Sequence, residues 1–230
     1  DHKRAIGHEL VDRLIEVHEV DYEAVGLDDL GYPEGFTERQ VETWTEQFEW
    51  AFEVTTDERE VPAVATVGDW LRDNAPDDHP QTLVHGDYKL DNVMFGPGTP
   101  PEIVSIFDWE LSTLGDPFTD LGWLLSFWFD PTDPDPPAPT GDLYGDFMRD
   151  EAFPTRSELV DRYEERTGLE FTNRRFYQVL GVYKLAALGE MFFRRYLEGN
   201  SDDPLYPQMR EGVPAIAERA VRIIDGEEPL

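Results

Sequence analysis

The segment LVHGDYKLDNVMF, residues 83–95, decides how the rest of the chain is interpreted. It places one histidine, two aspartates and one asparagine between apolar runs. Short runs of β-branched and aromatic residues bounded by glycine predict small strands. Asp87 and Asn92 are therefore expected on one turn whose two ends are pinned by strands. On these residues alone, a hydrogen-bonded Asx-type turn without chemistry is an equal alternative.

A further acidic residue follows at the end of the next predicted strand. The run EIVSIF leads into Asp108, sixteen residues after Asn92. Phosphoryl transfer from a nucleotide needs a carboxylate near the acceptor hydroxyl, and an amide oxygen with a second carboxylate that hold Mg²⁺ against the phosphates. Asp87, Asn92 and Asp108 supply these groups. The first two also have the spacing of the protein-kinase catalytic loop, in which Asn follows Asp by five residues.

The composition is that of a folded and strongly acidic chain. The 230 residues are 40% hydrophobic and 13% aromatic, which is enough for a real core. Asp and Glu number 50 against 19 Lys and Arg, so the formal net charge is -31 at pH 7. Such a surface repels nucleic acid and anionic membranes, and we expect neither as a partner. We interpret the acidity as adaptation to high salt, which screens self-repulsion; an ordinary acidic protein is the alternative.

Cysteine and long apolar runs are both missing from the sequence. The lack of cysteine excludes disulfides and thiolate metal sites, and it fits the cytoplasmic location that we expect. No signal-peptide pattern opens the chain, and no apolar run has the length of a membrane span. The longest apolar cluster, LGWLLSFWF at residues 121–129, predicts a buried helix or a pocket wall.

Helical periodicity dominates the rest of the chain. The predicted helices run from the start of the chain to about residue 18, and over about 38–52, 61–74, 155–168, 173–198 and 213–225. Thr155 and Glu158 form a capping box for the fourth of these helices. The proline-rich segment 131–140 predicts a loop. The sequence therefore predicts an α+β fold that is mainly helical, with a small β-hairpin region at the site.

Two motifs carry a family resemblance. HGDYKLDN at 85–92 and FDWELSTLGDPFTDLGWLL at 107–125 resemble the signature of the aminoglycoside phosphotransferase family of small-molecule kinases, which is similar in fold to the protein kinases. LIEVHEVD at 14–21 resembles the family's helix that leads into the larger lobe. The wording of YEERTG at 163–168 and RRYLEGN at 194–200 is most similar to the kinase-like domain associated with acyl-CoA dehydrogenases.

The resemblance implies a role for three residues of the first motif, His85, Asp87 and Asn92, and for Asp108. It implies Asp87 as the catalytic base, with Asn92 and Asp108 as ligands of Mg²⁺ at the nucleotide phosphates. It implies His85 as a support that positions the loop. Lys89 lies where protein kinases place a lysine that reaches the transferred phosphate, and a solvent-facing lysine is the alternative.

Three further carboxylates lie in the second motif. Glu110 is expected to contact the metal or the acceptor, or else to form a structural salt bridge. Asp116 and Asp120 are interpreted as structural support: the first in a turn, the second as a carboxylate at a helix start that braces the catalytic loop.

The part of a kinase that clamps the nucleotide is not recognisable before the catalytic loop. A kinase of this fold needs a Gly-rich loop and a strand lysine paired with a helix glutamate. The 84 residues before His85 have a helical pattern and a single lysine, Lys3. We therefore expect residues 1–230 to form the C-terminal, catalytic lobe of a longer protein, with the N-terminal lobe outside this chain. Natural loss of that lobe is the alternative.

These residues favour a kinase that uses Mg²⁺ and ATP or GTP to phosphorylate a hydroxyl of a small molecule, and that needs its N-terminal lobe for activity. The resemblance implies a hydroxyacyl acceptor; an aminoglycoside or amino alcohol is the alternative, although GWLLSFWF offers such a cation no carboxylate. A kinase-derived binding module without turnover stays open. So does a metal-dependent phosphoesterase using His85, Asp87 and Asp108, although that class normally has more histidine and acid ligands.

The acidic composition predicts a strong salt dependence of stability. At 0.01 M salt the Debye length is about 30 Å, so carboxylates repel one another across most of the molecule; at 1 M it is about 3 Å. We expect the melting temperature to rise steeply between dilute and molar KCl, as measured by differential scanning fluorimetry. A flat response would contradict the high-salt interpretation.

Overall fold

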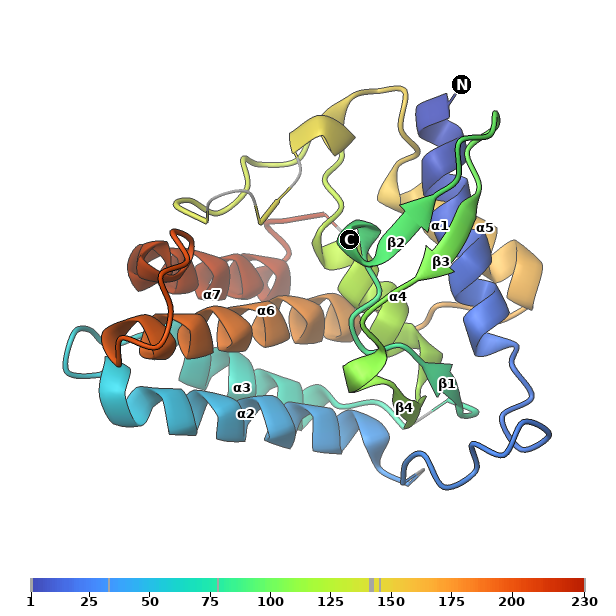
Figure 1. Cartoon of the computed structure of the whole chain (residues 1–230). Coiled ribbons are helices and arrows are strands. Elements are labelled where there is room, and N and C mark those ends of the chain that lie inside the picture. The colour runs from blue at the N-terminus through green and yellow to red at the C-terminus, as the bar shows by residue number, and fades with distance from the viewer. Residues whose placement is uncertain (1, 33, 78, 141–142, 145, 230) are drawn as a thin grey trace.

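The chain folds into a helical body with two small antiparallel sheets (Figure 1). The computed structural model describes residues 2–32, 34–77, 79–140, 143–144 and 146–229. The α-helices of these residues are α1 His2–His18, α2 Phe36–Thr55, α3 Pro62–Asn74, α4 Pro117–Ser126, α5 Arg156–Thr167, α6 Arg174–Leu197 and α7 Met209–Asp225. The predicted α+β class, mainly helical, is confirmed.

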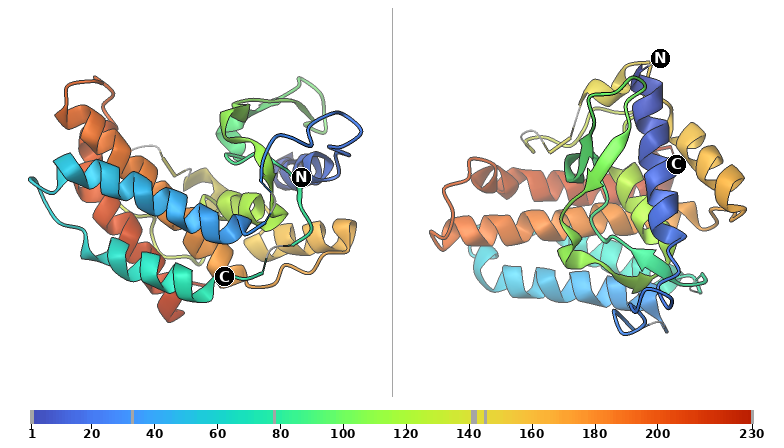
Figure 2. Two further views of the ribbon diagram at one scale, coloured as in Figure 1. Left: turned by 90° about the horizontal axis from the view of Figure 1, so that it is seen from below. Right: turned by 45° about the vertical axis from the view of Figure 1, so that its right-hand side comes forward.

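The helices form two groups that meet at α4. Helices α2, α3, α6 and α7 pack into one bundle, and α1 packs against α5 (Figure 1). Helix α4 packs against α6 of the bundle and against the first strand. Viewed from below in Figure 2, α4 lies between the bundle and α1. The segment after the first strand therefore starts at the junction of the two groups.

Each sheet is a pair of short strands. β1 Thr82–Val84 pairs with β4 Thr113–Gly115, and β2 Val93–Phe95 pairs with β3 Ile103–Ile106. The strands predicted in TLVHG, NVMFG and EIVSIFDW are confirmed. The sequence analysis missed β4, which pairs with β1, a distant part of the chain. The register of β2 and β3 brings the residue before β2 beside the residue after β3.

Helices α4 and α6 cross at backbone contact. A Cβ atom on Gly122 would lie 2.6 Å from the carbonyl oxygen of Tyr177, so only glycine permits this approach. The apolar cluster at 121–129 is buried, and α4 covers its first six residues, which confirms the predicted buried helix. No helix among the described residues is long and apolar enough to cross a membrane. The close crossing brings side chains of α6 next to those of α4.

The predicted capping box at the start of α5 is present. The backbone N–H of Thr155 donates to Glu158 Oε2 over 2.8 Å, and the N–H of Glu158 donates to Thr155 Oγ1 over 3.2 Å. The helix ends before Gly168, which has a left-handed φ of 72°. Local sequence therefore fixes both ends of this helix.

The prediction for the last helix was wrong at its N-terminus. The helix was expected to begin at about Val213, near Pro214, but α7 begins at Met209. Pro214 has no N–H for the carbonyl of Arg210, four residues earlier. The side chain of Arg59 donates to that carbonyl from Nε over 2.6 Å. A distant arginine therefore satisfies the group that proline leaves open, and the helix continues through the proline.

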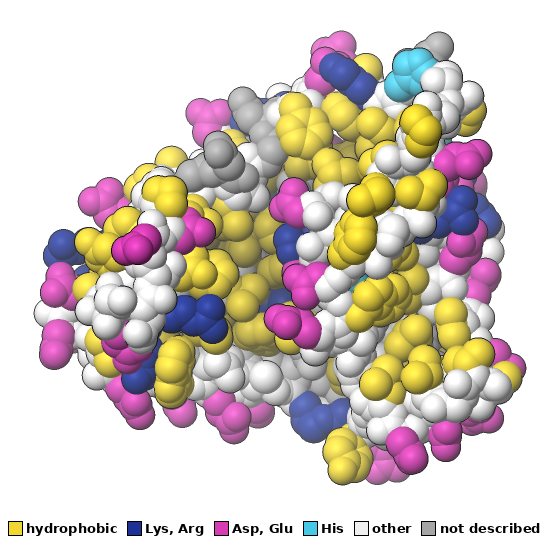
Figure 3. Space-filling model, viewed as in Figure 1, with side chains coloured by type: hydrophobic (Ala, Val, Ile, Leu, Met, Phe, Trp, Pro, Cys, Tyr) yellow, Lys and Arg dark blue, Asp and Glu magenta, His cyan; other side chains and the backbone are white. Residues whose placement is uncertain are grey.

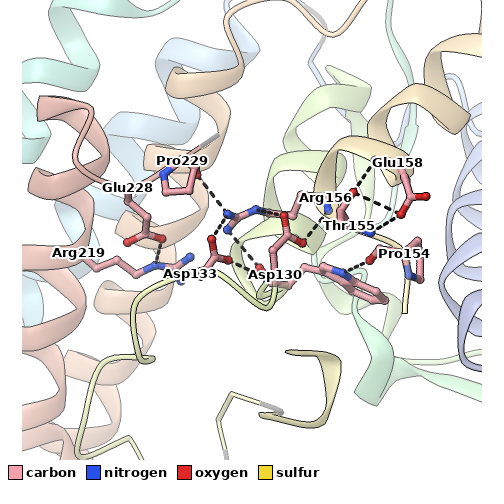
Figure 4. Close-up of polar contacts among 10 residues, drawn as sticks. Asp130, Asp133, Pro154, Thr155, Arg156, Glu158, Arg219, Glu228 and Pro229 are labelled. Atoms are coloured by element: carbon pink, nitrogen blue, oxygen red, sulfur yellow. Dashed lines mark hydrogen bonds and ion pairs between the residues drawn. The ribbon is translucent and has the colours of Figure 1, made fainter. Parts of the chain in front are cut away.

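Two buried ion pairs hold the chain that follows α4 (Figure 4). Arg156 Nη2 lies 2.7 Å from Asp133 Oδ1, and Arg219 Nε lies 2.8 Å from Glu228 Oε1. Arg219 also donates to the carbonyl of Ser126 at the end of α4 over 2.7 Å. The described residues of the loop predicted at 131–140 contain neither helix nor strand, as expected. The first pair ties the loop to α5, and the second ties α7 to the C-terminal segment.

Candidate active site

The segment between β1 and β2, residues 85–92, is called the catalytic loop below. A buried carboxylate holds its first two backbone N–H groups. The N–H of His85 donates to Asp120 Oδ2 over 2.6 Å, and the N–H of Gly86 donates to Asp120 Oδ1 over 2.8 Å. Gly86 has φ 81°, and a Cβ atom there would lie 2.4 Å from the carbonyl oxygen of Leu111. The loop therefore starts from a backbone geometry that only glycine accepts.

His85 links the loop to β3. Its ring is fully buried; Nε2 lies 2.8 Å from the carbonyl oxygen of Phe107, and Nδ1 accepts the N–H of Asp87 over 3.1 Å. A carbonyl only accepts, so Nε2 carries the proton and Nδ1 is the acceptor. Both ring nitrogens are thus used inside the protein, and His85 contributes no open ligand to the cleft.

Three donors surround the carboxylate of Asp87. Trp123 Nε1 donates to Oδ1 over 2.9 Å. Asn92 Nδ2 and Lys89 Nζ donate to Oδ2 over 2.8 and 2.5 Å. A carboxylate offers about four lone-pair sites, so Oδ2 is saturated and Oδ1 keeps about one site. The open site is therefore on the oxygen that Trp123 contacts.

Asn92 and Asp108 come together through the β2–β3 pair. The N–H of Phe107 donates to the carbonyl of Asn92 over 2.8 Å, which places Asp108 one residue away from this contact. The amide nitrogen of Asn92 is used on Asp87, which leaves its amide oxygen for a cation. Asp108 is exposed, has a left-handed φ of 62° and accepts no capping hydrogen bond. Its carboxylate therefore has room for a ligand.

These two oxygen donors fit Mg²⁺ at the phosphates of a nucleotide. Mg²⁺ is commonly held by one or two protein oxygens, with the remaining positions filled by water and phosphate. The described residues contain no group of three or more His, Cys, Asp or Glu side chains that would make a self-sufficient metal site. The donor set therefore suits a metal that arrives with its nucleotide.

The remaining predicted carboxylates lie at two different places. Glu110 is exposed, lines the cleft and has no ion-pair partner among the described residues. Asp116 caps α4 by accepting the N–H of Phe118 over 2.9 Å, and its other oxygen accepts from His79 and Tyr177 over 3.0 and 2.9 Å. Asp116 is buried outside the cleft, whereas Asp120, farther along α4, reaches the loop itself.

A cleft of about 630 Å³ opens beside Asp87. Figure 3 shows the hollow from the side on which it opens, with hydrophobic side chains along its floor. Its far wall comes from α2, the end of α4 and α6; the apolar side chains of this wall include Trp44, Trp123, Phe127, Leu180, Leu188 and Phe192. The four carboxylates that line it, Asp87, Asp108, Glu110 and Asp120, all lie on the side of the catalytic loop.

Comparison with known protein families shows to which family this chain belongs. The model described as "Phosphotransferase enzyme family" matches residues 1–157. The chain belongs to this family. The resemblance that the two motifs carry is thereby confirmed.

Relatives of this phosphotransferase-family chain include longer proteins. Acyl-CoA dehydrogenase family member 11 of Rattus norvegicus is 35% identical over 202 residues, which cover 86% of this chain and 25% of that protein. The chain thus spans about a quarter of the length of the curated relatives that it matches.

A crystal structure from Ralstonia eutropha assigned to the aminoglycoside phosphotransferases has a TM-score of 0.81 and 28% identity, covering 96% of this chain and 65% of that one. Aminoglycoside-3'-phosphotransferase of type VIII, with a TM-score of 0.54 and 18% identity over 79% of this chain and 61% of that one, shares the fold.

The sequence analysis missed two residues that contact the catalytic loop. Trp123 was assigned to an apolar wall or the core, yet its indole N–H binds Asp87. Lys184 was not considered, yet its ammonium lies in the cleft and donates to the carbonyl of Gly86. One signal was available: the sequence has only three lysines, and one of them lies in the apolar helical stretch GVYKLAALG.

Asp120 determines whether the loop keeps its geometry. Burial alone would raise its pKa, but hydrogen bonds from His18 and from the N–H groups of His85 and Gly86 lower it. The stability that this charge contributes is therefore present above the unfolded-state value near 3.8 and is lost as the pH falls through the lower folded-state pKa.

We expect Asp120→Asn to lower the free energy of unfolding at pH 7 by about 2–3 kcal/mol, because two N–H groups lose a charged acceptor. Urea unfolding in molar KCl measures the loss. The exposed helix variant Asp161→Asn is the control and should change stability little. Equal effects of the two variants would show that Asp120 does not hold the loop.

Proposed function

We propose that this chain is the catalytic lobe of a kinase that transfers the γ-phosphoryl group of ATP or GTP to a hydroxyl of a small molecule. One observation carries the proposal. Asp87 and Asp108 line the same open cleft, Asn92 donates to Asp87, and the carbonyl of Asn92 accepts the N–H of Phe107, the residue before Asp108. A general base beside an amide oxygen and a free carboxylate is the arrangement that phosphoryl transfer requires.

In this proposal Asp87 orients the acceptor and takes its proton. Trp123, Asn92 and Lys89 fix the carboxylate, and the free lone pair on Oδ1 receives the hydroxyl. Mg²⁺, when bound with the nucleotide at Asn92 and Asp108, would neutralise charge on the phosphates. Lys89 Nζ already lies against Asp87, where it is placed to stabilise negative charge near the transferred group.

We further propose that the lobe that clamps the nucleotide lies outside these 230 residues. The chain matches 65% of the Ralstonia eutropha structure while that match covers 96% of its own length. The activity tests below therefore use the full-length protein.

The cleft supports a hydroxyacyl or similar apolar alcohol as acceptor. The charged residues that α6 contributes to its lining are Lys184 and Arg195, and α2 contributes none. A polycationic sugar would meet positive charge at this wall instead of the carboxylates it needs. An aminoglycoside or amino-alcohol kinase is therefore the weaker alternative. A binding module without turnover does not need a carboxylate whose orientation is fixed by three hydrogen-bond donors, as that of Asp87 is.

The first test concerns the base. Asp87→Asn in the full-length protein should lower kcat by about a hundredfold or more while nucleotide affinity stays nearly unchanged, because the variant keeps the shape but cannot take a proton. Steady-state kinetics and nucleotide titration measure the two effects. The control is Asp91→Asn, an exposed carboxylate of the same loop. Wild-type turnover by the Asp87 variant would remove Asp87 from the mechanism.

The second test concerns the acceptor. In molar KCl with Mg²⁺ and ATP or GTP, we expect the full-length protein to phosphorylate hydroxyacyl thioesters or similar apolar alcohols faster than any aminoglycoside, because the far wall presents apolar side chains and positive charge but no carboxylate. A coupled assay over a panel of acceptors gives the rates. Robust phosphorylation of an aminoglycoside with none of a hydroxyacyl compound would contradict the assignment.

A further inference from the structure

A charged lysine is buried in the wall of the acceptor cleft. Lys184 lies on α6, is 8% exposed and lines the cleft that contains Asp87. Burial lowers its pKa to about 8, although the nearby carboxylates of Asp87 and Asp120 act in the opposite direction. Of the three lysines in this acidic sequence, Lys89 and Lys184 both lie at the site. A buried ammonium is costly, so its contacts need an explanation beyond the filling of space.

The contacts of Lys184 reach two other elements. Its Nζ donates a hydrogen bond to the carbonyl of Gly86 in the catalytic loop. It also lies 4.2 Å from the ring centroid of Trp123 on α4 and 5.1 Å from that of Trp44 on α2. Cation–π attraction to two indole rings offsets part of the desolvation cost. One side chain of α6 therefore joins α2, α4 and the loop.

The indole of Trp123 connects Lys184 to the proposed base, Asp87. Its face receives the ammonium of Lys184 and its Nε1–H donates to Asp87 Oδ1. Oδ1 is the oxygen with the open lone pair. The orientation of this indole therefore determines in which direction the free site of Asp87 points.

We propose that Lys184 is a positioning residue for phosphoryl transfer: by binding the Gly86 carbonyl and the Trp123 ring, it directs the open lone pair of Asp87 toward the acceptor. This inference rests on the proposed kinase function. Lys184 acts through the loop carbonyl and the indole, and it takes no proton from the substrate. It also couples the helices that form the acceptor wall to the base, so that an acceptor seated between α2 and α6 meets an aligned Asp87.

The charged groups around Lys184 set the sign of a pH effect. The loop presents Asp87 and Lys89, α4 presents Asp120, and α2 presents the uncharged ring of Trp44. Below a pH of about 8 the amine of Lys184 is charged, and its hydrogen bond to Gly86 and its cation–π contacts with Trp44 and Trp123 are at full strength. Above that pH the amine is neutral and the cation–π contacts are lost. Turnover that depends on Lys184 should therefore fall on the alkaline side.

Lys184→Met tests the inference in the full-length protein. Methionine fills a similar volume without the charge or the N–H donors. We expect kcat to fall by about ten- to a hundredfold, the scale of a misplaced catalytic group, with little change in the KM for nucleotide. We also expect the alkaline fall in kcat to disappear from the pH profile, and backbone N–H groups of residues 85–92 to exchange with deuterium faster.

Two further variants keep the outcome decisive. Trp123→Phe keeps the ring but removes the N–H on Asp87, and should reproduce the loss of kcat. Arg194→Met is the matched control: Arg194 lies on the same helix, with its guanidinium 3.9 Å from the ring centroid of Trp50 on α2 and outside the cleft lining. Its kcat and loop exchange should stay near those of the wild type.

The outcomes separate this inference from the function on which it rests. If the wild-type protein transfers phosphoryl groups and Lys184→Met keeps the kcat and alkaline limb of the wild type, Lys184 is not a positioning residue and the kinase function stands. If the wild-type protein transfers none, the proposed function fails; unchanged deuterium exchange of the loop in Lys184→Met then overturns the positioning contact as well.

Discussion

The site depends on one buried carboxylate that accepts two backbone N–H groups. Asp120 takes the N–H groups of His85 and Gly86, and so sets the direction in which the catalytic loop leaves β1. His18 on α1 lies 3.3 Å from the same carboxylate, and its other ring nitrogen lies 2.8 Å from Tyr163 on α5. Helix α4 and the pair of helices α1 and α5 are therefore joined at this charge. Without it, the donors around Asp87 would have no fixed frame.

Asp87 is held from two sides of the cleft. Lys89 and Asn92 belong to its own loop, and the β2–β3 pair places Asp108 beside them. On the other side, the crossing of α4 and α6 brings the indole of Trp123 to the same carboxylate. The loop side presents carboxylates and amide oxygens, and the bundle side presents rings and positive charge. The first suits metal and phosphate, and the second suits an apolar acceptor.

Local sequence predicted what local interactions determine. The capping box at Thr155, the stop at Gly168 and the strands β1, β2 and β3 follow from neighbouring residues, and all are present. Asp87 and Asn92, which flank the strands in the first motif, also lie in contact, as expected. The misses depend on distant contacts: β4 pairs with β1, and α7 passes Pro214 because Arg59 satisfies a carbonyl. Lys184 and Trp123 were missed as partners of the loop for the same reason, since only the α4–α6 crossing places them there.

In the proposed reaction the phosphoryl group ends on a hydroxyl of the acceptor. ³¹P nuclear magnetic resonance of the full-length protein with Mg²⁺, ATP or GTP, and a hydroxyacyl thioester in molar KCl follows that group directly. We predict a new phosphate-ester signal that grows in step with ADP or GDP and needs the acceptor. Inorganic phosphate as the only product would identify a hydrolase. ATP and GTP that both stay intact would identify a binding module, and either result would rule out the proposed kinase reaction.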